Sequence, residues 1–174
     1  KQIYGYEGNR KSILVVDDDP SHRGLAGDLL SPLGFNVVEA RDAEDCLSMV
    51  STLTPDLFLI DRLMPGIDGP TLARRLRERG FSVPILMVSA NATEDTLGND
   101  ENPAYDDYLT KPVRLESLLE RLGFHMNIAW NHAPIKDRTS ISSVIKPTAN
   151  ELPTKDICQN IIRLLHNKRS FFII

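Results

Sequence analysis

Short apolar runs alternate with amphipathic stretches along residues 12–124. Apolar runs of this length are typical of strands buried on both faces of a parallel sheet, and the amphipathic stretches between them are typical of connecting helices. The pattern therefore predicts an α/β fold built from five strand-and-helix units. The first, third and fourth runs are the most apolar, so we expect these strands at the centre of the sheet. The predicted strands are 13–17, 36–39, 57–61, 85–89 and 107–109.

Polar residues mark where the helices between these strands begin and end. Asp19 followed by Pro20 predicts a helix start, and Gly34 predicts the end of the same helix. Asp42 caps the second predicted helix, and the third begins near Pro70. The last predicted helix repeats the apolar stripe with Leu115, Leu118, Leu119 and Leu122.

The segment 91–102 is the weakest helix candidate. Ala92 and Leu97 are its apolar residues, and Gly98 lies within it. Neither helix propensity nor burial favours a stable helix there. We expect the fourth helix to be short, displaced or mobile.

Charge divides the chain into two parts. Residues 1–124 hold 13 Lys and Arg against 21 Asp and Glu, whereas residues 125–174 hold 7 against 3. The division predicts a domain over 12–124, a lead-in over 1–11, and an extension over 125–174 with one helix near 154–168. The third predicted helix is basic, but the domain around it is acidic, so we expect a solvated face rather than a nucleic-acid site. Its arginines are Arg74, Arg75, Arg77 and Arg79.

The cysteines and the hydropathy pattern bound the class of protein. The chain has two cysteines, too few for a disulfide framework and without the paired spacing of a zinc site. Cys46 falls on the apolar stripe of the second helix, so we expect a small buried side chain rather than a reactive thiol. No apolar run is long enough to cross a bilayer. We expect a cytoplasmic protein.

Polar side chains end four of the five predicted strands. In an open parallel α/β sheet, ligands bind outside the carboxyl ends of the strands, so we expect these side chains at one site. Three converging carboxylates repel one another, and a hard cation with oxygen ligands, most plausibly Mg²⁺, relieves that repulsion. A carboxylate nucleophile, a cation and two positioned donors suit phosphoryl transfer. The residues are Asp17, Asp18, Asp61, Ser89 and Lys111.

Four segments, each at a predicted strand end, carry a resemblance to a known family. Their sequences are ILVVDDDP over 13–20, DLFLIDRLMPGIDG over 56–69, VSA over 88–90 and YLTKP over 108–112. In this order they resemble the receiver domain of two-component response regulators. The resemblance implies a flavodoxin-like, doubly wound, five-stranded parallel sheet with strand order 2-1-3-4-5. It also implies that the phosphoryl donor is a phosphohistidine on a histidine kinase or a histidine phosphotransfer domain.

The resemblance assigns roles to the strand-end residues. Asp61 is the phosphoacceptor, and Lys111 and Ser89 hold the phosphoryl oxygens. The implied ligands of Mg²⁺ are Asp61, Asp18 and the backbone carbonyl of Leu63, with Asp17 acting through a water molecule. His22, in the first turn of the first helix, is expected to be an ordinary residue rather than a catalytic one.

Other positions govern the switch and the lifetime of the phosphoryl group in this family. Ser89 and Tyr108 are the implied switch pair. In the family the hydroxyl residue moves toward the phosphoryl group and the aromatic residue turns inward, which alters the face made by the fourth helix, fifth strand and fifth helix. Leu63 and Asn91 stand where the family tunes phosphoryl lifetime. Because Leu63 has no hydrogen-bonding group, we predict slow self-dephosphorylation. The alternative is that Leu63 only shields the site.

Two parent proteins fit this chain. One is a hybrid sensor histidine kinase, because residues 4–10 and 21–23 resemble receivers that follow a kinase core. Because the chain begins at Lys1 rather than Met, we expect a fragment of a larger protein or a processed chain. The other is a stand-alone regulator whose extension is an interaction arm. A phosphorylation-independent pseudo-receiver is a further alternative, and the complete set of strand-end residues argues against it. The extension is too short for an ordinary DNA-binding domain, so no nucleic-acid partner is expected.

Overall fold

A five-stranded parallel sheet forms the centre of the molecule. The computed structural model describes residues 2–90, 103–133 and 172–173, all of which belong to one compact unit. The strand order is β3-β2-β4-β5-β6, which confirms the predicted 2-1-3-4-5 order and places the three most apolar strands at the centre. Every strand bound lies within one residue of its predicted range. The strands are β2 (Ser12–Val16), β3 (Asn36–Ala40), β4 (Leu57–Asp61), β5 (Ile85–Ser89) and β6 (Asp107–Thr110).

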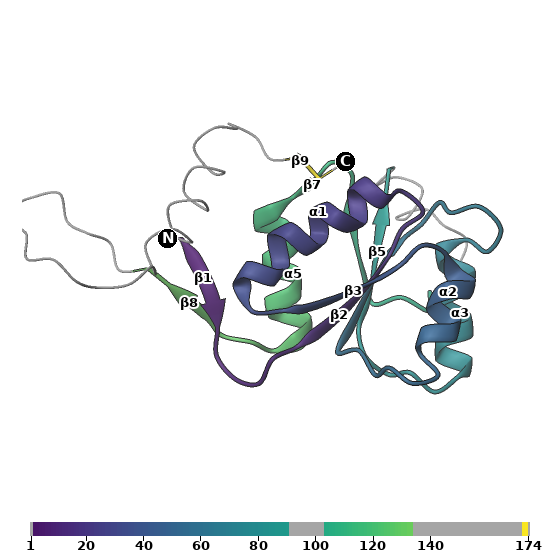
Figure 1. Ribbon diagram of the computed structural model, residues 1–174, viewed down its shortest axis with the longest axis horizontal. Coiled ribbons are helices and arrows are strands. Elements are labelled where there is room, and N and C mark those ends of the chain that lie inside the picture. The colour runs from purple at the N-terminus through teal and green to yellow at the C-terminus, as the bar shows by residue number, and fades with distance from the viewer. Residues whose placement is uncertain (1, 91–102, 134–171, 174) are drawn as a thin grey trace, which may run out of the picture. The chain divides into compact units, whose positions relative to one another are not determined.

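Helices cover both faces of this sheet (Figure 1). Because successive side chains of a strand point to opposite faces, Ile13 of β2 packs toward α1 and α5, and Leu14 packs toward α2 and α3. Cys46 of α2 is fully buried in the second of these cores, and burial raises the pKa of its thiol to about 12. The helices are α1 (Pro20–Leu30), the 3₁₀ turn η1 (Ser31–Leu33), α2 (Ala43–Met49), α3 (Gly69–Glu78) and α5 (Leu115–Met126).

Aspartate side chains cap three of the helices. The carboxylate of Asp19 accepts a hydrogen bond from the Ser21 amide at the start of α1, and Asp42 does the same for α2. Asp68 caps α3, which begins one residue before the predicted start. Gly34 adopts a φ of 102° after η1, a left-handed conformation that favours glycine. Each cap therefore satisfies amide groups that would otherwise have no partner.

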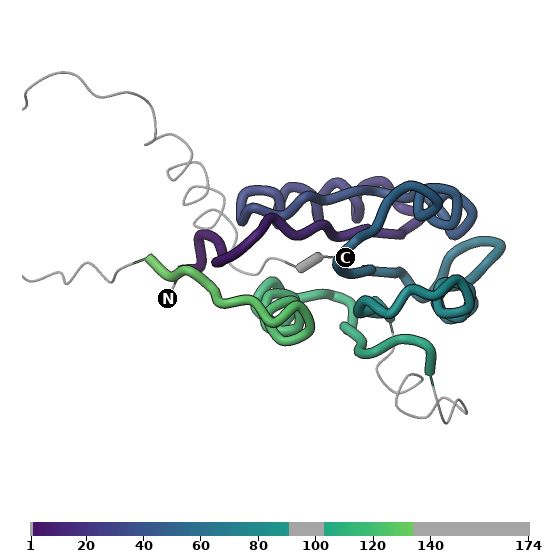
Figure 2. Tube along the Cα trace, turned by 90° about the horizontal axis from the view of Figure 1, so that it is seen from below, coloured from purple at the N-terminus to yellow at the C-terminus, as the bar shows by residue number. Residues whose placement is uncertain are grey.

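A two-stranded antiparallel ribbon joins the two ends of the receiver-like segment. Its strands, β1 (Ile3–Tyr6) and β8 (Trp130–His132), lie side by side in Figure 2. The Tyr6 ring stacks on Phe35 with centroids 4.5 Å apart, and Trp130 meets both rings edge-on at about 6 Å. Trp130 also packs so closely on Gly123 that a Cβ there would lie 2.6 Å from its Nε1 atom. No sequence pattern predicted this ribbon.

The basic face of α3 is only partly the solvated face that the sequence predicts. Arg74 and Arg75 are exposed. Arg77 instead crosses to the chain before β6, where its guanidinium donates to the carbonyl of Ala104 at 3.0 Å and to the carboxylate of Asp106 at 2.7 Å. It also donates to two carbonyls before β5. Arg77 is therefore a structural residue that fixes the approach to two strands.

One further strand pair lies outside the central sheet and the ribbon. The short strand β7 (Val113–Arg114) pairs antiparallel with β9 (Phe172–Ile173). Within the part of the chain that the structure describes, no helix is both long and apolar enough to span a membrane. The predictions for the fourth helix over 91–102 and for a helix near 154–168 lie outside the described residues.

Candidate functional site

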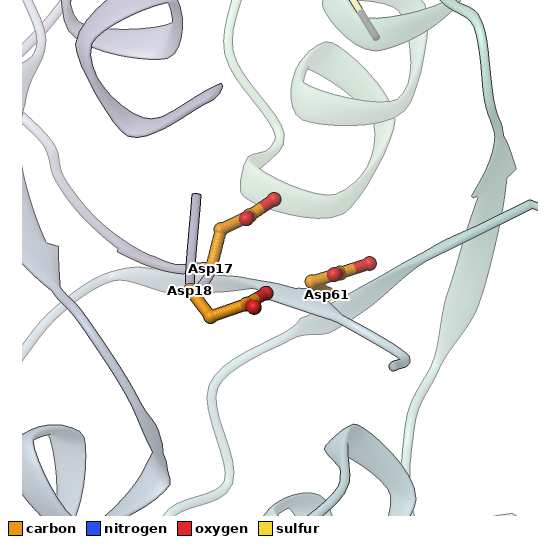
Figure 3. A group of neighbouring side chains, drawn as sticks. All are labelled: Asp17, Asp18 and Asp61. Carbon is orange, nitrogen blue, oxygen red and sulfur yellow. The ribbon is translucent and has the colours of Figure 1, made fainter. Parts of the chain in front are cut away.

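Three carboxylates meet at the carboxyl ends of two neighbouring strands. β2 and β4 are adjacent, and Val16 is the register partner of Ile60, so the residues that follow them reach the same edge of the sheet. One carboxylate oxygen from each of Asp17, Asp18 and Asp61 lies within 4.8 Å of the other two. Figure 3 shows the three side chains extending to the same side of the strand ends. Asp17 and Asp61 are buried and Asp18 is exposed, so the group opens to solvent at Asp18.

Lys111 forms ion pairs with two of these acids. Its Nζ atom lies 3.2 Å from Oδ1 of Asp61 and 3.8 Å from Oδ2 of Asp17. Burial raises the pKa of Asp61, the Lys111 ammonium opposes that shift, and the charge of Asp17 adds to it, so the pKa lies above the usual value. One ammonium thus leaves the negative charge of the group incompletely balanced.

The donor set fits a hard divalent cation. Carboxylate oxygens are the ligands that Mg²⁺ prefers, and Mg²⁺ typically keeps several waters while binding one or two carboxylates. The half-open group of two buried acids and one exposed acid matches this preference, because solvent can reach the cation from the side of Asp18. A divalent charge would also offset the repulsion from Asp17, which adds to the effect of burial in raising the pKa of Asp61.

Ser89 and Lys111 come to this edge from the next two strands. Val88 is the register partner of Asp61, so Ser89 extends one residue further along β5, and its side chain is buried. The backbone N–H of Lys111 donates to the carbonyl of Ser89 at 2.7 Å, which ties the end of β6 to the end of β5. The structure thus brings the five residues predicted from the strand ends to one edge of the sheet.

The loop after Asp61 is tied to the neighbouring strand β5 at its start and is closed by a hydrogen bond at its end. The Arg62 amide donates to the carbonyl of Val88 at 2.8 Å, and the Gly69 amide donates to the carbonyl of Arg62 at 3.0 Å. The Leu63 side chain is 66% exposed at the start of this loop. At Gly69 a Cβ would lie 2.5 Å from the Asp61 carbonyl oxygen, so the position admits only glycine without a shift.

Tyr108 and Asn91 are the two remaining residues that the sequence predicts to be functional. Tyr108 stands on β6 and packs, partly buried, against the core that α2 and α3 cover. The residue before it is anchored, because the carboxylate of Asp107 accepts a hydrogen bond from Arg121 and another from His125 at 2.9 Å. Asn91 lies outside the described residues.

Sequence reasoning did not predict two contacts to Asp17. The ring of His22 lies with Nδ1 3.0 Å and 3.2 Å from the two carboxylate oxygens of Asp17. The Arg23 guanidinium donates to the backbone carbonyl of Asp17 at 2.7 Å. The first turn of α1 folds back over the end of β2, and no motif or periodicity in the sequence signals which of its side chains then meets Asp17.

A comparison with protein-family models identifies the family. Residues 13–123 match the response regulator receiver domain, which is more than half of the chain. The chain belongs to this family. Its receiver domain carries the acidic pocket of Asp17, Asp18 and Asp61 described above, an arrangement typical of the Mg²⁺ site of receivers.

Curated relatives of the receiver domain come from two kinds of protein. The sensor histidine kinase RcsC of Salmonella typhi is 37% identical over 113 residues, which cover 65% of this chain and 12% of that protein. The response regulator MprA of Mycobacterium avium is 31% identical over 164 residues, covering 93% of this chain and 70% of that protein. The chain therefore corresponds to only a small part of the kinase relative.

Solved structures agree with the fold. The response regulator protein TrrA of Thermotoga maritima, solved in complex with Mg²⁺-BeF, superimposes with a TM-score of 0.59 at 29% identity. The match covers 66% of this chain and 97% of that one. Because response regulator receivers are the phosphoaccepting domains of two-component signalling, membership of this family implies a kinase partner for phosphotransfer.

Proposed function

We propose that this receiver accepts a phosphoryl group from a phosphohistidine onto Asp61, with Mg²⁺ as cofactor. The observation that carries the proposal is the position of Asp61. It is buried at the end of β4, 3.2 Å from Lys111, within a group of three carboxylates that fits a divalent cation. A histidine kinase or a histidine phosphotransfer domain supplies the phosphoryl group.

Each residue of the site has a defined part in that reaction. A carboxylate oxygen of Asp61 forms a bond to phosphorus while the bond from phosphorus to the donor imidazole breaks, and the imidazole nitrogen keeps the electron pair and takes up a proton. Lys111 and the Ser89 hydroxyl hold the oxygens of the transferred group. No general base is needed, because the nucleophile is already a carboxylate.

Asp18, Asp61 and the backbone carbonyl of Leu63 would hold the cation directly, and Asp17 would hold it through water. When bound, Mg²⁺ neutralises negative charge on the oxygens of the transferred group. The exposure of Asp18 supports this assignment, because a hydrated cation can reach the group of acids from the side of Asp18.

We favour a hybrid sensor histidine kinase as the parent protein. The 37% identity to RcsC over the receiver supports this choice, together with the resemblance of residues 4–10 to the segment between a kinase core and its receiver. A stand-alone regulator is the second candidate, since the match to MprA extends over 93% of this chain. The upstream coding sequence discriminates them: a kinase ATP-binding region there supports the first, and its absence supports the second.

Intact-mass measurement after incubation with Mg²⁺ and a small acyl phosphate donor tests the proposal. We expect the wild-type chain to gain the mass of one phosphoryl group, Asp61→Asn to gain none, and omission of Mg²⁺ to abolish the gain. Asp28→Asn, which alters an exposed acid on α1, serves as the matched control and should be phosphorylated like wild type. No gain in the wild type, or a gain that persists in Asp61→Asn, would refute the proposal.

A further inference from the structure

His22 makes a close contact with a buried acid of the pocket. Its Nδ1 atom lies 3.0 Å from Oδ2 and 3.2 Å from Oδ1 of Asp17. Because a carboxylate offers only acceptors, a hydrogen bond at this distance requires that Nδ1 carry the proton. The histidine side chain is 19% exposed and that of Asp17 is 9% exposed, so solvent does little to replace this contact.

The other groups around Asp17 leave the carboxylate plane to be set by His22. The Asp19 amide donates to Oδ1 at 2.8 Å, which fixes one oxygen. Lys111 is 3.8 Å from Oδ2, beyond hydrogen-bond distance, and lies closer to Asp61. Among the contacts described for this carboxylate, His22 is the group that reaches both oxygens.

The ring of His22 is itself held in place. His22 lies in the first turn of α1, which Asp19 caps and Pro20 begins, so its backbone is fixed relative to the end of β2. Its second ring nitrogen, Nε2, lies 3.7 Å from Oδ2 of Asp19. The neighbouring Arg23 binds the Asp17 carbonyl, which fastens the same helical turn to the same strand end. The histidine therefore meets Asp17 from a rigid element.

We infer that His22 is a positioning residue for the divalent-cation site: by donating Nδ1–H to Asp17, it fixes the direction in which that carboxylate faces Asp18 and Asp61. The inference rests on the proposed function, since it concerns the Mg²⁺ that the receiver is proposed to bind. His22 acts through Asp17 and touches neither the cation nor the reacting atoms. Carboxylates that serve a metal are commonly oriented by such hydrogen-bond partners.

Removing the donor has a predictable effect on cation binding. Without His22, one hydrogen bond from the Asp19 amide remains, and the carboxylate of Asp17 can rotate toward the ammonium of Lys111. Loss of a hydrogen-bond partner of a direct metal ligand typically weakens metal affinity by about 10–100-fold. Because Asp17 acts through water, we expect His22→Leu, which removes the ring and its N–H, to raise the Kd for Mg²⁺ by a factor near the lower end of this range, about 10-fold.

Two further variants distinguish positioning from general damage to the fold. Asn places its side-chain N–H where the histidine has Nδ1, so His22→Asn should restore an affinity close to that of wild type. His125→Leu is the matched control, because His125 makes a similar contact to Asp107 at 2.9 Å and is likewise largely buried, but belongs to a different part of the fold. It should leave the Mg²⁺ affinity unchanged.

Calorimetric titration of Mg²⁺ into the full chain, wild type and the three variants, tests the inference. A weakened His22→Leu with a rescued His22→Asn and an unaffected His125→Leu supports it. Equal or tighter binding by His22→Leu overturns it, as does equal weakening of His22→Leu and His22→Asn, or of His22→Leu and His125→Leu. If the wild-type chain itself binds no Mg²⁺, the proposed cofactor of the receiver fails, a result distinct from failure of the His22 inference.

Discussion

Replacing Gly69 with alanine should destabilise the receiver and displace Asp61, the proposed phosphoacceptor. Gly69 opens α3 directly beside the end of β4, and its amide closes the loop from Arg62. A Cβ at this position would lie 2.5 Å from the carbonyl oxygen of Asp61, 2.7 Å from Sδ of Met87 and 2.9 Å from Cα of Arg62. Two of these three atoms belong to the backbone, so relief of the clash requires movement of the strand end that carries Asp61.

The expected size of the effect follows from two opposing contributions. Overpacking a tight site typically costs about 1–3 kcal/mol. The alanine also restricts the unfolded chain, which favours folding by about 0.4–1 kcal/mol. We therefore expect Gly69→Ala to lower the free energy of unfolding by about 1–2 kcal/mol, and to slow phosphorylation of Asp61 because the acceptor is displaced.

Gly24→Ala is the control of opposite sign. Gly24 lies within α1, and a Cβ added to it would meet no atom within 4 Å. A glycine inside a helix is less favourable than alanine by about 0.5–1 kcal/mol, so this variant should be more stable than wild type. Both free energies can be measured by urea unfolding followed through the fluorescence of Trp130, the single tryptophan of the chain. A Gly69→Ala variant as stable as wild type would show that the clash does not govern this position.

Three further predictions address the ribbon, the acid stability and the phosphoryl lifetime. Trp130→Ala should lower the free energy of unfolding by about 1–3 kcal/mol, because the half-buried ring packs on Tyr6, Phe35 and Gly123. Tyr4→Ala, on the exposed side of the same ribbon, should change it by less than about 0.5 kcal/mol. Circular dichroism during urea unfolding measures both, and similar losses would contradict the role given to the aromatic contacts. Burial acts to raise the pKa of Asp107, but hydrogen bonds from His125, the Tyr108 amide and Arg121 together lower it by more than burial raises it. The pKa of Asp107 therefore lies below its usual value. The stability that ionised Asp107 contributes is therefore present above the unfolded pKa of about 3.9 and is lost as the pH falls toward the folded pKa. The difference in unfolding free energy between wild type and Asp107→Asn should therefore shrink in acid. A difference that stays constant down to acid pH counts against this account. Leu63→Asn should make the acyl phosphate on Asp61 decay faster than in wild type, as followed by intact mass over time, and an unchanged decay would favour a purely shielding role for the exposed Leu63 side chain.

Local patterns in the sequence were sufficient to predict the central sheet. Strands buried on both faces require continuous apolar runs, and β2, β4 and β5 consist of such runs. The caps at Asp19 and Asp42 were predictable for a similar reason, because a capping side chain bonds to amides two or three residues away. The site residues followed from the same reasoning, since the carboxyl ends of parallel strands share one edge.

The order of the strands required more than composition and periodicity. Those patterns do not show which strands are neighbours, and the order came from the resemblance to receivers before the structure confirmed it. The resemblance also supplied the roles of Ser89, Lys111 and Tyr108. The position of Ser89 and Lys111 beside Asp61 then depends on the register of β4, β5 and β6.

Tertiary structure alone decided two kinds of contact: those between groups that are distant in the sequence, and those that no periodic pattern or motif signals. The β1–β8 ribbon pairs segments from the two ends of the receiver, and short strands with mixed polarity carry no local signal of their partner. Arg77 looked like part of a solvated face because the carbonyls that it binds belong to other elements. His22 is near Asp17 in sequence, yet its ring meets that carboxylate only because α1 turns back over the end of β2. The sequence by itself determined which residues form the sheet and end its strands, and the packing of helices against that sheet determined which side chains hold the acids in place.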